Sequence, residues 1–389
     1  MSRSSESRWR NLGATAGAVA AVLFAVFDLY QWALAYAGDK FHNDFTFYYA
    51  AARIGAAHGW GLIYNLGLQQ SELTAMGSGI TIAQLARFIS PPPVAWLALP
   101  FTALPYPLAY WLWSALLVGA LAAVCALAAP GHRWIRLIFF AAAVGWLPVI
   151  YSLQLGQPGM FVALGVAGCY ALLRDRPLWA GIALGAVVLK PQLAFLVPLA
   201  LLAARRDRAF LGSVIAIGGL AAASVIAVGP GGAGDYLARL NFASTVPVNR
   251  ELTLAAVFGD AGTARIAEAL IAAWTLYLVY RQRHREPEWV FVTALVGGML
   301  ATPYLHLDDL AMFGLAAFLY LRTNPPAWSW SYVLAFVLVV EGEPIWGPGP
   351  VIAAEASALV LVSAAALMTR AGHPLPQIDA RPLEIRPTR

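Results

Sequence analysis

The sequence predicts an all-α membrane protein, a polytopic transmembrane helix bundle of about 10–12 spans. Hydrophobic residues occupy 60% of the 389 positions and charged residues only 12%, about half of the charged share that soluble domains carry. The mean hydropathy is +0.67. Helices are the expected element because backbone groups inside a bilayer must be hydrogen-bonded within their own segment. Alternating segments of about ten residues, typical of membrane β-barrels, are absent from the sequence.

Basic residues orient the predicted bundle. Cytoplasmic loops of membrane proteins are enriched in Lys and Arg, so Arg3, Arg8 and Arg10 predict a cytoplasmic N-terminus. The net charge of +5 is therefore interpreted as an orientation signal and not as a nucleic-acid-binding surface. The two cysteines, Cys125 and Cys169, lie within apolar runs and are interpreted as core residues.

The first span is expected at about 12–35, and a long external loop follows at about 36–105. The last part of this loop, 93–104, is apolar but too short to cross a bilayer. Residues 178–204 are interpreted as two short helices broken at Lys190 and Pro191, since proline interrupts a helix. The other spans are expected at about 106–129, 134–152, 158–173, 210–229, 264–280, 288–303, 310–321, 329–346 and 350–369.

The predicted domain organisation is simple. Residues 1–370 are expected to form a single transmembrane domain that includes a second external loop at 230–263. Residues 371–389 are polar and contain several prolines, which predicts a disordered cytoplasmic tail.

Polar residues at the membrane edge are costly to keep there and are therefore functional candidates. Four clusters of them are expected on the external face. The first runs from Asn43 to Arg53. Asp44 either caps the helix that follows or acts as a general base for a sugar hydroxyl. Tyr48 lies one turn later on the same helical face, so both side chains can point into one substrate-binding cleft.

The other three clusters each have a functional and a structural interpretation. Lys190 and Gln192 flank Pro191, and Lys190 either neutralises a lipid phosphate or is an interfacial lysine with its ammonium in water. Gln157 either belongs to a simple turn between spans or binds a sugar or phosphate. His306, followed by Asp308 and Asp309, contacts substrate or phosphate, binds a metal, or stabilises a loop. Adjacent aspartates do not face one site, which argues against a metal.

The order of these motifs along the chain is informative. Asp-Phe-x-x-Tyr-Tyr-x-Ala-Ala-Arg starts at Asp44, and Tyr-Asn-Leu, Pro-Pro-Pro, Gly-Gln, Leu-Lys-Pro-Gln and Pro-Tyr-x-His follow it. Over roughly residues 12–370 the chain resembles glycosyltransferase family 87. That family belongs to the C superfamily of membrane transferases, which use polyprenyl-phosphate sugars. No glycine-rich nucleotide loop is present, which argues against a nucleotide-driven mechanism.

The resemblance implies a mechanism. Asp44 would deprotonate an acceptor hydroxyl, which attacks the anomeric carbon and inverts its configuration as polyprenyl phosphate leaves; the sugar is typically mannose. Lys190, Gln192 and Arg53 would bind the donor phosphate, and His306 would contact donor or acceptor. The family context of His306 differs here, since Leu305 precedes it where relatives often carry Trp or Ser. Neither a metal nor another cofactor is needed, because a cationic side chain can supply the electrostatic stabilisation.

The remaining expectations concern partners, location and a rival function. Gln157 and Asp308 are expected to bind substrate together with Tyr48. The partners are a polyprenyl-phosphate sugar, a glycolipid or glycan acceptor and the lipid bilayer, with the site on the periplasmic or extracellular face of the cell membrane and both termini in the cytoplasm. The alternative is a transporter or flippase of a lipid-linked saccharide. Such proteins place charges near the midplane in related halves, and only Asp28 and Glu355 lie within predicted spans.

Overall fold

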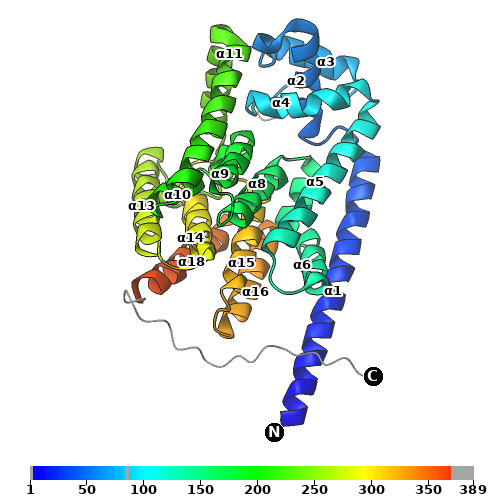
Figure 1. Ribbon diagram of the computed structural model, residues 1–389. Coiled ribbons are helices and arrows are strands. Elements are labelled where there is room, and N and C mark those ends of the chain that lie inside the picture. The colour runs from blue at the N-terminus through cyan, green and yellow to red at the C-terminus, as the bar shows by residue number, and fades with distance from the viewer. Residues whose placement is uncertain (1–2, 84–86, 369–389) are drawn as a thin grey trace.

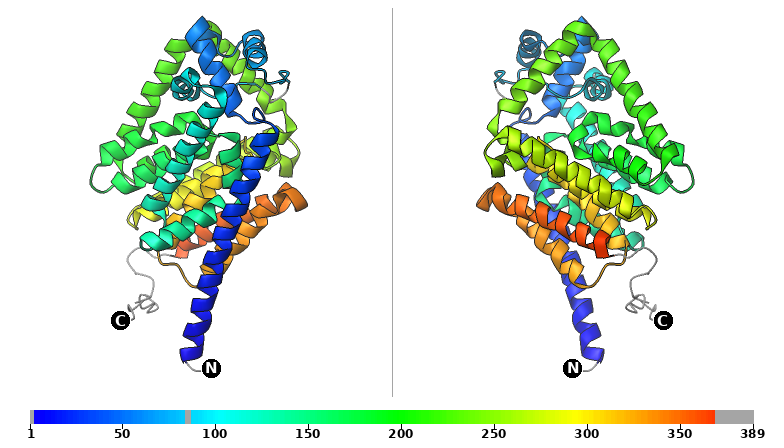
Figure 2. Two further views of the ribbon diagram at one scale, coloured as in Figure 1. Left: turned by 90° about the vertical axis from the view of Figure 1, so that its right-hand side faces the viewer. Right: turned by 90° about the vertical axis from the view of Figure 1, so that its left-hand side faces the viewer.

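The computed structural model describes residues 3–83 and 87–368, and all regular elements in these ranges are helices (Figure 1). This confirms the predicted all-α class. The first helix, α1 (Arg3–Gly38), runs along the outside of the bundle from the N-terminus to the opposite end (Figures 1 and 2). The predicted tail at 371–389 lies outside the described residues.

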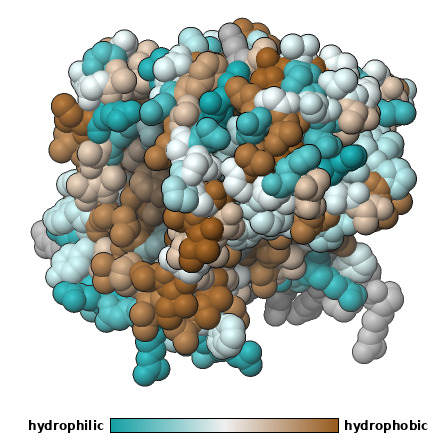
Figure 3. Space-filling view, turned by 90° about the horizontal axis from the view of Figure 1, so that it is seen from above, coloured by the Kyte–Doolittle hydropathy of each residue, from teal (hydrophilic) through white to brown (hydrophobic). Residues whose placement is uncertain are grey.

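The expected external loop folds into short helices, which we call the cap. It comprises α2 (Phe45–His58), α3 (Leu66–Ala75) and α4 (Pro92–Ala98) and lies at the end of the bundle opposite the N-terminus (Figure 1). Figure 3 views this end of the molecule and shows polar and apolar residues side by side. The short apolar stretch at 93–104 is too short to span, as expected, and packs in the cap as α4 and a 3₁₀ turn.

Over the ranges that the structure describes, five helices are long and apolar enough to cross a membrane, and they make the protein a polytopic membrane protein. These are Thr15–Gly38 of α1, α5 (Tyr106–Ala128), α11 (Asp207–Thr245), α13 (Ala261–Arg281) and α18 (Pro348–Met368). A sixth span results if α6 (Arg133–Val144) and α7 (Leu147–Leu155), bent by 71° at their junction, count as one. The expected 10–12 spans are approached only if the shorter apolar helices also cross.

Shorter helices complete the bundle. In chain order they are α8 (Gly159–Leu172), α9 (Pro177–Ala183), α10 (Leu196–Ala203), α12 (Leu254–Phe258), α14 (Pro287–Leu300), α15 (Met312–Arg322), α16 (Trp328–Glu341) and α17 (Glu343–Trp346). Short 3₁₀ helices join several of them, including η3 (Leu184–Leu189), η4 (Pro191–Leu193), η5 (Pro247–Arg250) and η6 (Leu307–Ala311).

The break predicted at Lys190 and Pro191 is present. A residue before proline avoids the α conformation, and Lys190 is accordingly extended (φ −152°, ψ 78°) between η3 and η4. The prediction of an external loop at 230–263 is wrong over its first half, because α11 continues to Thr245. Gly229 leaves helical geometry (φ 66°), and Pro230, which is favoured at the start of a helix, begins the second part of α11.

Candidate active site

A cavity of about 1070 Å³ lies where the cap meets the bundle. Its walls come from the segment after α1, the α7–α8 turn, the break at Lys190, the end of α11, the start of α13 and the segment before η6. Of the residues proposed from the sequence, those that line it are Asp44, Tyr48, Gln157, Lys190, Gln192 and His306. Asp44 and His306, which are 262 positions apart in the chain, therefore line one cavity.

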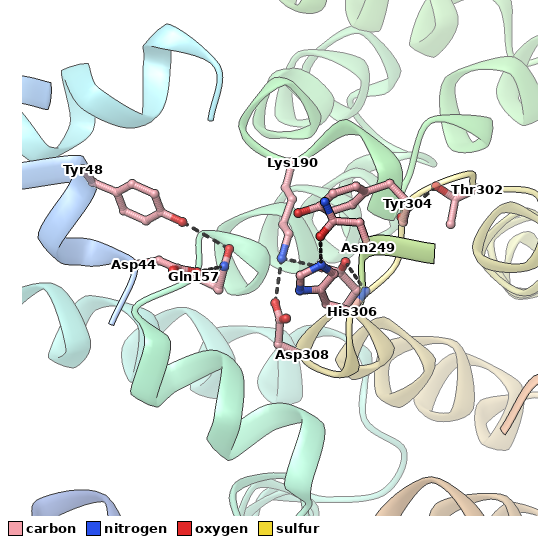
Figure 4. A network of polar contacts seen from close by, with 10 residues as sticks. Asp44, Tyr48, Gln157, Lys190, Asn249, Thr302, Tyr304, His306 and Asp308 are labelled. Carbon is pink, nitrogen blue, oxygen red and sulfur yellow. Dashed lines mark hydrogen bonds and ion pairs between the residues drawn. The ribbon is translucent and has the colours of Figure 1, made fainter. Parts of the chain in front are cut away.

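Asp44 is not the helix cap, because its neighbour takes that role. The side chain of Asn43 accepts a hydrogen bond from the backbone N–H of Thr46 (3.1 Å), while Asp44 makes no capping bond. The Asp44 carboxylate instead accepts a hydrogen bond from the side-chain amide of Gln157 (Figure 4). Tyr48 donates to the other end of that amide, Oε1 of Gln157, at 3.2 Å. Gln157 thus connects the first and third predicted clusters.

The α7–α8 turn holds Gln157 in place. Gly156 ends α7 in the left-handed conformation (φ 70°), where a side chain is strained. A Cβ at this position would also lie 2.9 Å from the Cβ of Phe45. The indole Nε1 of Trp113 donates to the Gly156 carbonyl at 2.8 Å, which anchors the turn against α5.

Lys190 is buried and forms ion pairs with two aspartates. Its Nζ lies 2.6 Å from Oδ2 of Asp308 (Figure 4). The same Nζ also contacts Oδ1 of Asp309. Burial opposes the charge on Lys190, but the two carboxylates outweigh burial and raise its pKa well above the usual value. Asp308 does not appear among the residues lining the cavity and contacts Lys190 instead.

His306 is held by a residue that the sequence did not single out. Its Nε2 lies 2.6 Å from Oδ1 of Asn249, whose amide nitrogen donates to the carbonyl of Ala243 at 2.6 Å. The second bond fixes the orientation of the Asn249 amide, so Oδ1 accepts and Nε2 of His306 carries the proton. Burial lowers the pKa of His306. A neutral ring therefore lines the cavity beside Tyr304, whose ring stacks on it with a centroid distance of 5.0 Å.

The surroundings of Asp44 raise the pKa of its carboxyl group. Burial above all, and then the charge of Asp308, raise its pKa to about 7. The charge of Lys190 and the hydrogen bond from Gln157 act in the opposite direction. A carboxyl with a pKa near the working pH is suited to general base catalysis.

Arg53, expected at the donor phosphate, is not brought to this site. It pairs with Glu72 inside the cap at 2.9 Å and is not among the cavity-lining residues. Nothing in the sequence predicted a role for Asn249, apart from its place in an expected external loop. Within the described ranges, no three His, Cys, Asp or Glu side chains are arranged to hold a metal ion.

The family-model comparison identifies the class of protein. The model of glycosyltransferase family 87 matches residues 88–303, more than half of the chain. The chain belongs to glycosyltransferase family 87. It is therefore a membrane glycosyltransferase, with a sugar donor and an acceptor as substrates. The match includes Gln157, Lys190 and Gln192, whereas Asp44 precedes it and His306 follows it. No curated protein and no solved structure matches the chain.

Proposed function

We propose that this family 87 glycosyltransferase transfers a sugar, mannose, from polyprenyl phosphate to an acceptor hydroxyl on the periplasmic or extracellular face. One observation supports this most directly. The carboxylate of Asp44, which makes no ion pair within the described residues, lines the same cavity as Lys190 and His306. A base and a cation around one opening are what a displacement with an anionic leaving group requires.

The reaction proceeds by a single displacement. Asp44 takes the proton of the acceptor hydroxyl, and the oxygen forms a bond to the anomeric carbon. The bond from that carbon to the phosphate oxygen breaks at the same time, and its electron pair leaves with polyprenyl phosphate. The configuration at the anomeric carbon is inverted. Gln157, which Tyr48 holds through Oε1, orients the Asp44 carboxylate toward the acceptor.

Lys190 stabilises the leaving phosphate in this scheme. An ammonium group has three N–H donors, and the contacts with Asp308 and Asp309 use two of them. The third is available to a phosphate oxygen in the cavity, and Gln192 adds an amide donor from the next turn. Burial raises the pKa of Asp309 to about 6, so this carboxyl is still mostly ionised at neutral pH, in contact with Lys190.

His306 contacts a hydroxyl group in this arrangement. A neutral imidazole whose Nε2–H is engaged by Asn249 presents only the Nδ1 lone pair, which is an acceptor. An ionised phosphate, in the donor or in the leaving group, offers no proton to such an atom, whereas a sugar or acceptor hydroxyl does. We therefore assign His306 to hydroxyl recognition, next to the base.

The test uses the purified protein with polyprenyl-phosphate mannose and a panel of glycolipid and glycan acceptors. We expect release of polyprenyl phosphate only when an acceptor is present, and loss of at least about a hundredfold in rate in Asp44→Asn. Asp39→Asn, which changes an exposed carboxylate five residues earlier, is the matched control and should retain activity. A folded Asp44→Asn protein with normal transfer would refute the proposal. Acceptor-dependent release also separates a transferase from a transporter.

A further inference from the structure

Two arginines meet near the cavity from different elements. Arg87 comes from the segment between α3 and α4, and its Cζ lies 4.3 Å from the ring centroid of Phe242 on α11. Arg239 precedes Phe242 by three residues, so both side chains lie on the same face of α11. The two guanidinium groups are therefore neighbours across the junction of cap and bundle.

Neither guanidinium has an anionic partner among the described residues. The Nε–H groups of Arg87 and Arg239 are both buried and donate to no acceptor in the described protein. No described carboxylate lies within ion-pair distance of either group, and this includes Asp235, one turn before Arg239. Burial and the charge of Arg239 both lower the pKa of Arg87. Two unpaired cations side by side are unfavourable unless an anion binds between them.

The position of the pair indicates what kind of anion it receives. Arg87 lines the cavity, as do Tyr236, Leu240 and Ala243 on the adjacent stretch of α11. Leu237 and Leu240, on either side of Arg239, are 61% and 41% exposed. An anionic group at the arginines would therefore lie next to an exposed apolar helix surface. This combination fits the polar head and the chain of an amphiphile.

The pair is distinct from the site at Asp44. The charges with the largest effects on the pKa of Asp44 are those of Asp308, Lys190 and Asp309, and Arg87 is not among them. Arg87 comes from the loop before α4, whereas Lys190 lies at the η3–η4 break. Arg87 is therefore a second cationic position on the cavity wall, on a different element from Lys190.

We propose that Arg87 and Arg239 bind the phosphate of a phosphate ester at a second subsite, at the edge of the cavity that Arg87 lines. A planar guanidinium matches phosphate oxygens with two parallel N–H donors. The binding itself does not depend on the proposed function. If that function holds, the group bound here is a phosphate on the acceptor, and the enzyme selects acceptors that carry one.

The test is calorimetric titration of the purified full chain in a neutral maltoside detergent at low ionic strength. The probes are dihexanoyl phosphatidylglycerol, glycerol phosphate and, as the probe without phosphate, dihexanoylglycerol. We expect phosphate-dependent binding to the unmodified protein and at least a tenfold loss of affinity in Arg87→Gln and in Arg239→Gln. Binding of the lipid probe alone identifies a lipid head group as the ligand, and equal binding of glycerol phosphate identifies a soluble phosphate ester. Either result supports the site.

Two controls separate this site from general attraction and from catalysis. Arg265→Gln removes one positive charge from another wall of the same cavity and should leave the affinity unchanged. Asp44→Asn should bind the probes normally even though transfer is lost, so failure of the proposed function and failure of this inference give different results. Equal affinity in Arg87→Gln and the unmodified protein, an equal loss in Arg265→Gln, or equal binding of dihexanoylglycerol would overturn the inference.

Discussion

The carboxylate of Asp44 is only partly ionised at neutral pH, because burial raises its pKa to about 7. Gln157 favours the ionised form by donating a hydrogen bond to it, as does the positive charge of Lys190. The pKa of this base is therefore lowered by two side chains from different parts of the chain. Its strength depends on residues that lie 113 and 146 positions later in the chain.

The pH dependence of transfer follows from this. A general base must be deprotonated, so kcat/KM should rise about tenfold per pH unit below pH 7 and level off above it. Removing the Gln157 hydrogen bond in Gln157→Leu raises the pKa of Asp44, and the rising limb should move to higher pH. Steady-state rates between pH 5 and 9 test this. A limb that is unchanged in Gln157→Leu would contradict the assignment of Asp44 as the titrating base.

Lys190 gives a second prediction at the scale of single residues. Lys190→Met leaves Asp308 and Asp309 buried without their cation, which should cost about 3–5 kcal/mol in the free energy of unfolding. The variant in which all three groups are neutral, Lys190→Met, Asp308→Asn, Asp309→Asn, should recover most of that loss, because no unpaired carboxylate remains. Denaturant unfolding in detergent measures both. Equal destabilisation of the two variants would show that the ion pairs are not the cause.

At the scale of elements, proline and glycine explain most of what could be predicted from the sequence. Pro105 precedes the first residue of α5, and Pro191 marks the break after Lys190. The kink in α11 was missed because Gly229 and Pro230 look like the end of a helix, although the following residues resume one. The pairing of His306 with Asn249 could not be predicted either, since it depends on how η5 and η6 meet in space.

Close packing of α9 against α11 leads to a prediction about glycine. A Cβ on Gly181 would collide with the backbone of Ala209, and one on Gly212 with the backbone carbonyl of Leu178. Small residues allow membrane helices to approach this closely. Gly181→Ala and Gly212→Ala should each lower the unfolding free energy by about 1–3 kcal/mol. Gly218→Ala on the same helix, where a Cβ meets no atom within 4 Å, is the control and should be neutral or slightly stabilising.

The whole molecule combines a helical bundle with a cap, and the cavity lies between them (Figure 1). Four clusters separated in the sequence were expected on one face, and the structure brings side chains from all four to this cavity. Their shared face could be predicted because spans alternate direction and basic residues mark one side. The sequence could not predict which wall of the cavity each cluster forms. It also could not predict that Arg53 pairs with Glu72 inside the cap, because both outcomes depend on packing between elements distant in the chain.

The orientation of the cap relative to the membrane remains a prediction of the charge pattern, and two cysteine variants test it. Ser71 is exposed on α3 in the cap, and His284 is exposed in the basic turn between α13 and α14 at the other end of the bundle. A membrane-impermeant maleimide should label Ser71→Cys in intact spheroplasts and His284→Cys only after lysis. Cys125 and Cys169 are 2% and 0% exposed, so the unmodified protein should stay unlabelled and serves as the control. The reverse pattern would place the cap, and the cavity beneath it, in the cytoplasm, where the proposed external transfer reaction could not occur.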